Sequence, residues 1–108
     1  MTPWDIYTWT LPDTGAHPAV IVGTDERLRL KDKVNVLLCS SHRSRRPPEA
    51  NEVLLNGADG LDWETLCKCD LLYAVDKRHL TQRRGSVSPA RRRAIGERLI
   101  RALGLAGL

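Results

Sequence analysis

The chain has 108 residues, of which 42% are hydrophobic and 28% are charged, and its formal net charge is +4. This length suits one domain with a single hydrophobic core, and this composition excludes a disordered chain. No apolar run approaches the roughly 20 residues that span a bilayer, and the first residues lack the basic and apolar stretches of a signal peptide. We therefore expect one domain over residues 1–108, with no membrane partner and a cytoplasmic location.

The first part of the chain predicts three strands. Residues 4–11 are rich in aromatic and β-branched side chains and alternate in part, which is typical of a strand. Residues 12–15, Pro-Asp-Thr-Gly, predict a turn. Continuous apolar runs at 19–23 and 34–39 predict two buried strands, and the polar segment 25–33 between them predicts a loop or one short helical turn.

The middle of the chain predicts two more strands. Residues 40–48 contain three arginines and end in two prolines, so we expect a loop. Residues 52–55 predict a short strand that ends at an Asn-Gly turn, and residues 66–75 predict a longer strand with a bend. Residues 62–66 predict a helical turn or a bulge.

A helix follows, because Ser88 suits an N-cap and Pro89 suits the first helical position. Gly104 lies where a glycine usually ends a helix. Four apolar residues repeat with the helical period between these points: Ile95, Leu99, Ala102 and Leu103. About five strands and one helix predict a mainly β fold with a C-terminal α-helix, built as a small closed or nearly closed barrel.

The charge is unevenly placed along the chain. Residues 1–76 carry 8 Lys/Arg and 12 Asp/Glu, whereas residues 77–108 carry 9 Lys/Arg and a single acidic residue, Glu97. Such a basic segment favours an anionic partner, although a solvated helix face explains it as well. The run Arg91–Arg93 lies in the first turns of the helix, against the macrodipole. Either an anion docks there or solvent screening makes the cost negligible.

The chain has three cysteines, Cys39, Cys67 and Cys69, and an odd number without an export signal argues against a disulfide framework. Only one residue separates Cys67 from Cys69 and the histidines are scattered, so a zinc site fits less well than buried thiols. We expect buried free thiols that act as small hydrophobic groups, and neither a metal nor another cofactor.

Six segments together resemble the MazF/PemK family of bacterial toxins. In chain order they are Trp4-Asp5-Ile6-Tyr7, His17-Pro18-Ala19-Val20-Ile21-Val22, Leu38-Cys39-Ser40-Ser41, Cys69-Asp70, Val75-Asp76-Lys77-Arg78-His79-Leu80 and Gly85-Ser86-Val87-Ser88. Their order and spacing match the family over nearly the whole chain. The resemblance implies an SH3-like barrel that forms a homodimer, with a groove for single-stranded RNA that a cognate acidic antitoxin also occupies. It further implies metal-independent cleavage, which leaves 2′,3′-cyclic phosphate and 5′-OH ends.

The resemblance also implies where the catalytic residues lie. His17 stands where the family has arginine and Ser40 where it has threonine, while Lys68 and Asp70 match a cation and a carboxylate near the Cys-Asp step. An imidazole can transfer protons near neutral pH, but it lacks the bidentate phosphate contact of arginine. Leu71 replaces the usual glutamine.

Further residues beside this site are expected to contact RNA: Ser41, Arg43, Arg45, Arg46 and Lys77. Taken singly, each of these side chains, and each catalytic candidate, also has an ordinary structural explanation as a turn, strand-end or solvated surface residue. Two functions remain open at this stage. One is an endoribonuclease toxin, and the other is a catalytically degenerate family member that only binds RNA or protein.

Overall fold

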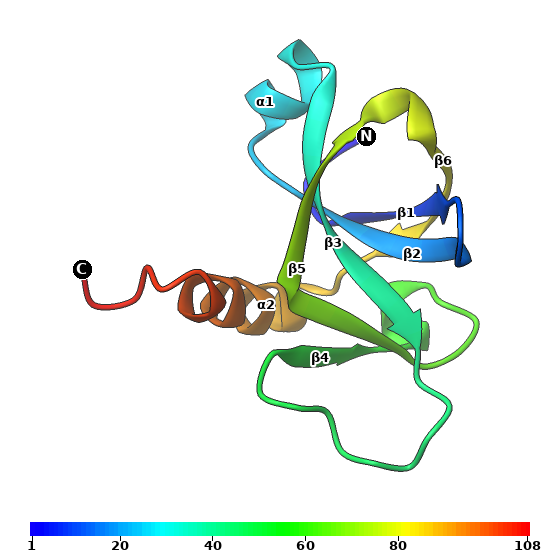
Figure 1. Cartoon of the computed structure of the whole chain (residues 1–108), viewed down its shortest axis with the longest axis vertical. Helices are drawn as coiled ribbons and strands as arrows, with labels where there is room; N and C mark the ends of the chain where they lie inside the picture. The colour runs from blue at the N-terminus through cyan, green and yellow to red at the C-terminus, as the bar shows by residue number, and fades with distance from the viewer.

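The computed structural model describes residues 1–108 as one six-stranded antiparallel sheet with a C-terminal helix (Figure 1). The strands are β1 (Asp5–Leu11), β2 (Gly15–Val22), β3 (Lys33–Ser41), β4 (Glu52–Leu55), β5 (Thr65–Asp76) and β6 (Leu80–Ser86). The helices are α1 (Asp25–Leu30) and α2 (Pro89–Ala102), and the short 3-10 turns are η1 (Gly57–Asp59) and η2 (Lys77–His79). The strand order is β4-β5-β3-β2-β1-β6. No helix is long and apolar enough to cross a membrane.

The predicted class, mainly β with a C-terminal helix, is confirmed, but the number of strands is six rather than five. The additional strand is β6, whose sequence Leu-Thr-Gln-Arg-Arg-Gly-Ser lacks an apolar alternation and is held by pairing with β1. Of the two alternatives for residues 25–33, the short helical turn is confirmed. Residues 25–30 form a helix that the side chain of Thr24 caps, and Leu28 is buried. The helical turn or bulge expected at 62–66 is wrong. The turn lies at η1, β5 already begins at Thr65, and the bulge of β5 lies between Cys67 and Leu72.

Strand β5 bends sharply in its middle, as expected (Figure 1). Leu37 pairs with Leu72 and Cys39 with Cys67, so one residue of β3 lies opposite four residues of β5. At this bulge the backbone N–H of Cys69 turns to the carbonyl of Asn51, at 2.8 Å. The bend therefore lets one strand pair with both β3 and β4, and it curls the sheet around its core.

The hydrogen-bonded sheet does not close into a barrel, since β4 and β6 are its two edges and do not pair. The edges are joined instead by a backbone contact between η1 and β6. A Cβ atom on Gly85 would overlap the carbonyl oxygen of Asp59, so only glycine fits there. The chain is thus a nearly closed barrel whose last gap is filled by a turn.

Helix α2 begins at Pro89 with Ser88 as its N-cap, as predicted, but the Ser88 side chain makes no capping bond. The buried carboxylate of Asp59 accepts from the backbone N–H of Ser88 at 2.8 Å and from Arg91 Nη1 at 2.6 Å. This carboxylate explains why a cation is stable in the first turn: the expected anion is supplied by the fold itself. Arg93 pairs with Glu97 at the surface.

The apolar stripe of α2 is buried only in its first half. Ile95 is fully buried and Leu99 packs against the core, whereas Leu103 is exposed. Gly104 adopts a positive φ of 71° just beyond the helix, which confirms the predicted stop.

Candidate functional site

The register of the central strands divides the predicted site residues between two faces of the sheet. Ala19 of β2 pairs with Leu38 of β3, and side chains alternate along a strand, so His17 and Ser40 share one face. Ser40 pairs with Leu66, which places Lys68 and its partner Glu52 on that face as well. We call this the site face.

The opposite face carries the neighbours of these residues. It presents Pro18 from β2, Ser41 from β3 and Thr65 from β5. We call this the cleft face, because Pro18 and Thr65 line a cleft described below.

His17 is held by hydrogen bonds from both ring nitrogens. Nδ1 lies 3.2 Å from the carbonyl oxygen of Cys39, and Nε2 lies 3.1 Å from the hydroxyl of Thr14. Pro18 has no N–H to donate at this point of the ladder, and the imidazole supplies a donor to β3 instead. Because a carbonyl oxygen only accepts, we assign the hydrogen to Nδ1 in the neutral ring, which leaves the lone pair on Nε2. His17 thus contacts the residue immediately before Ser40.

A buried carboxylate organises the cations of the site face. Glu52 is only 3% exposed and receives both terminal nitrogens of Arg46, at 2.8 and 3.1 Å, together with the ammonium of Lys68. The bidentate bond from Arg46 holds the pKa of Glu52 well below its usual range. The backbone N–H of Glu49 and the side-chain ammonium of Lys68 also lower this pKa. The same bond raises the pKa of Arg46. Two cations thus share one buried carboxylate, and the carboxylate of Glu49 lies near enough to Arg46 to raise its pKa as well.

The remaining predicted residues are not all brought to this cluster. Asp70 is exposed at the bend of β5, beyond the bulge that separates Cys67 from Leu72, and it makes no ion pair. Arg43 and Arg45 are exposed on the loop that follows β3.

Lys77 lies at the far end of the sheet from the cluster. Its backbone N–H bonds to Asp32, which directly precedes β3, whereas Ser40 is near the end of that strand.

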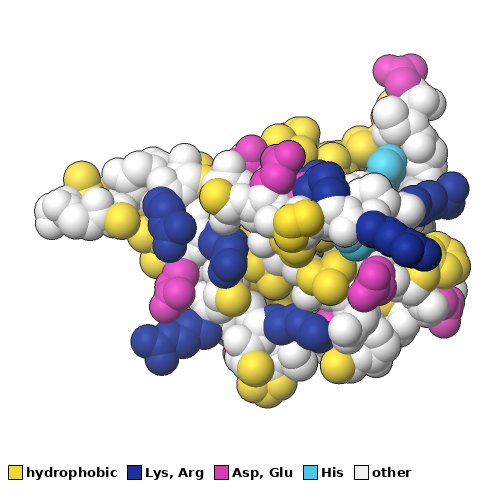
Figure 2. All heavy atoms as spheres, turned by 90° about the horizontal axis from the view of Figure 1, so that it is seen from below, with side chains coloured by type: hydrophobic (Ala, Val, Ile, Leu, Met, Phe, Trp, Pro, Cys, Tyr) yellow, Lys and Arg dark blue, Asp and Glu magenta, His cyan; other side chains and the backbone are white.

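On the face of the molecule that Figure 2 shows, basic side chains are not gathered in one patch. In the view of Figure 2, Lys and Arg groups alternate with Asp and Glu, and histidine surface lies between Lys and Arg groups in the right half. No group of three or more metal-ligating side chains is close enough to hold an ion. The expected buried free thiols are confirmed for all three cysteines.

Sequence reasoning missed two aromatic residues near the site. Trp9 pairs directly with His17 across β1 and β2, so its indole lies on the site face, where it packs edge-on against Tyr73 with ring centroids 5.2 Å apart. Trp63 lies before β5 and donates from Nε1 to the hydroxyl of Ser41, at 3.0 Å. Their signal was their rarity, since the chain has only three tryptophans and two tyrosines.

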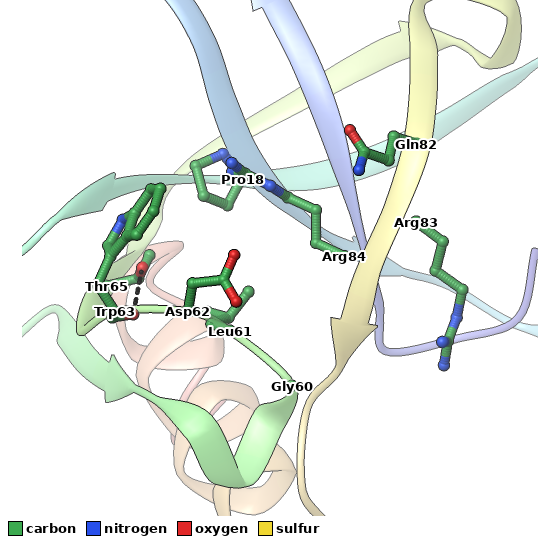
Figure 3. Close-up of a pocket in the computed structure, with 9 residues that line it drawn as sticks. All are labelled: Pro18, Gly60, Leu61, Asp62, Trp63, Thr65, Gln82, Arg83 and Arg84. Atoms are coloured by element: carbon green, nitrogen blue, oxygen red, sulfur yellow. Dashed lines mark hydrogen bonds between the residues drawn. The ribbon is translucent and has the colours of Figure 1, made fainter.

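A cleft of about 200 Å³ opens on the cleft face, between β6 and the segment before β5 (Figure 3). Its lining includes Pro18, Asp62, Trp63, Thr65 and Arg84. Of these, none was predicted as a site residue. A second hollow of about 320 Å³ adjoins Trp9 on the other side of the molecule.

Comparison with known proteins places this arrangement in a family. Residues 2–103 match the model of the PemK-like, MazF-like toxin of type II toxin-antitoxin systems. An endoribonuclease in complex with its cognate antitoxin, from a mycobacterial species, is similar over 100% of this chain and 99% of that chain, with 24% identity and a TM-score of 0.84.

Two further solved structures share the fold. The Mycobacterium tuberculosis toxin MazF-mt6 has 20% identity, a TM-score of 0.80 and coverage of 94% of this chain and 97% of that chain. A MazE-MazF structure from Deinococcus radiodurans has 15% identity, a TM-score of 0.77 and coverage of 98% and 97%. Because the family model matches nearly the whole of the chain, the protein belongs to the PemK-like, MazF-like toxin family of type II toxin–antitoxin systems.

Proposed function

We propose that the protein is an endoribonuclease toxin that cleaves single-stranded RNA without a metal ion, leaving 2′,3′-cyclic phosphate and 5′-OH ends. The observation that carries the proposal is the cluster on the site face. There an imidazole with a defined tautomer, a serine hydroxyl and two cations lie at the adjoining ends of β2, β3 and β5. These are the groups that a transesterification at phosphorus requires.

In this mechanism His17 is the base. Its Nε2 exchanges the hydroxyl of Thr14 for the ribose 2′-OH and takes that proton, while the 2′ oxygen forms a bond to phosphorus and the bond from phosphorus to the 5′ oxygen breaks. The leaving oxygen takes a proton from solvent. Ser40 donates a hydrogen bond to a non-bridging oxygen, and the charged ends of Lys68 and Arg46 attract the phosphate. Ser41, Arg43 and Arg45 extend the RNA contact along the following loop.

Asp70 and Lys77 have no step in this mechanism, because the β5 bulge and the length of β3 separate them from His17. They stand as surface contacts for a longer RNA. The partner that silences the toxin is a cognate antitoxin with an acidic segment, which the exposed Arg43 and Arg45 of the following loop attract. The active form is a homodimer that works in the cytoplasm, where RNA substrates are found.

The test is cleavage of a long single-stranded RNA by the purified protein in EDTA, with the product ends mapped. Discrete cuts that carry 2′,3′-cyclic phosphates support the proposal. His17→Ala should abolish them while the thermal melting curve is retained. His79→Ala is the matched control, because His79 is exposed at the other end of β5.

Intact RNA from a folded protein would contradict the proposal. It would leave the alternative, a binding protein without catalysis, for which one observation speaks: both ring nitrogens of His17 already have protein partners. An active His17→Ala variant would refute the role of His17 alone.

A further inference from the structure

The cleft between β6 and Trp63 combines an aromatic surface with opposite charges. Figure 3 shows Arg84 of β6 reaching across it toward Pro18, with Asp62 below and the Trp63 indole at its side. The neighbouring Arg83 points away on the other side of β6, where it pairs with Asp5. Charged and aromatic side chains from β6 and from the segment before β5 therefore line the cleft.

The indole of Trp63 offers a surface on which a planar ligand can stack. Its side chain is 53% exposed, although the hydrogen bond to Ser41 fixes the position of its ring edge. An indole that is held by its N–H and leaves a face open is suited to stacking, with little loss of side-chain entropy on binding.

Arg84 and Asp62 have no partners of opposite charge. The six ion pairs of the structure include neither residue, even though Arg84 is half-buried. A guanidinium and a carboxylate without ion-pair partners in one cleft suit a ligand that both accepts and donates hydrogen bonds.

We propose that this cleft binds one base of the RNA, with a preference for guanine; the inference rests on the proposed function. Trp63 stacks on the base and Asp62 accepts from the adjacent N1–H and N2–H₂ groups, a pair of donors that guanine alone presents. Arg84 donates to the O6 and N7 edge, which is its usual pairing with guanine. An acidic peptide fits less well, because Asp62 would repel it.

The test uses fluorescein-labelled 2′-O-methyl oligonucleotides, UUGUUU and UUAUUU, in which the attacking hydroxyl is blocked so that binding is measured without cleavage. Fluorescence anisotropy gives the Kd. We expect the guanine oligonucleotide to bind at least about fivefold more tightly than the adenine one. Trp63→Ala should weaken binding roughly 5- to 150-fold. Trp63→Phe, which keeps a stacking ring, should recover part of this loss.

Asp62→Asn should remove the guanine preference while the adenine oligonucleotide binds as before. The matched control is Asp13→Asn, an exposed carboxylate in the β1–β2 turn, which should change neither Kd. Circular dichroism checks that each variant is folded.

The outcomes separate this inference from the proposed function. If wild-type protein cleaves natural RNA but Trp63→Ala binds as tightly as wild type, the inference is overturned and the proposed function stands. Guanine binding that depends on Trp63, without any cleavage, supports the inference and overturns the proposed function. If Trp63→Ala loses affinity only for a poly-glutamate peptide, the cleft is a protein-docking site and the inference fails.

Discussion

Replacement of Asp59 by asparagine tests how the gap between the edges of the sheet is held. Asp59 is buried, and its two carboxylate oxygens accept from the backbone N–H groups of Asn56 and Ser88 and from Arg91. Asparagine has nearly the same shape, but one of its terminal groups is a donor. That donor would face the N–H of Asn56 or Ser88, and Arg91 would lose its counter-charge.

The expected cost follows from the burial of the two partners. Breaking a buried ion pair from one side costs about 3–5 kcal/mol, and we take the lower end, about 3 kcal/mol, because Arg91 keeps 28% of its side chain exposed. For a domain of this size each kcal/mol lowers Tm by about 4–8 °C, so the Tm of Asp59→Asn should fall by roughly 12–24 °C.

The assay is thermal and urea unfolding of both proteins, followed by circular dichroism at pH 7. Arg93→Ala, which removes an exposed pair from the same helix, is the control and should cost less than about 0.5 kcal/mol. A Tm for Asp59→Asn within about 3 °C of wild type would refute the reasoning, since it would mean that water replaces the carboxylate in this contact.

Three other changes test the packing and the site face. Gly85→Ala should destabilise the fold by several kcal/mol, because its Cβ has no space beside Asp59, whereas Gly57→Ala, which meets no atom within 4 Å, should be nearly neutral in the same urea titration. The lowered pKa of Glu52 stabilises the folded state above the ordinary value of 4.5, and this contribution is lost as pH falls below it. The stability gap between wild type and Glu52→Gln, measured by urea unfolding, should therefore shrink from pH 7 to pH 3, and a constant gap would show that Glu52 acts only by packing. Hydrogen bonding between thiols and burial raise the pKa of Cys67 and Cys69, so neither should react with iodoacetamide at pH 8 until the protein is unfolded, as mass spectrometry would show.

The sequence was informative wherever local chemistry decides the structure. Apolar runs located β2 and β3, the short strand β4 was predicted with its observed bounds, and Ser88-Pro89 marked the start of α2. Prediction from the sequence failed where contacts between residues distant in the sequence determine the structure. The polar strand β6 is a strand only because β1 pairs with it, and the anion beside Arg91 comes from a turn 32 residues earlier.

The same distinction applies to the site. The family resemblance proposed His17 and Ser40 as site residues, and the register brings both to one face. Composition did not reveal that Lys68 and Arg46 share Glu52, because Glu52 had no motif of its own. Nor did it reveal the cleft, which needs β6 and the segment before β5 to meet, and both are irregular in sequence.

Side chains alternate between the two faces along β2 and β3. Insertions and deletions should therefore be tolerated less well within these strands than in the turns that join them. His17 and Pro18 are neighbours in sequence but belong to opposite faces, as do Ser40 and Ser41. Deleting a single residue between Pro18 and Val22 would shift His17 to the other face and away from Ser40, without removing any functional group. The turn at 12–14 lies outside the ladder, so residues can be added there at little cost. Relatives of this protein should therefore differ in length in this turn and keep the spacing of β2.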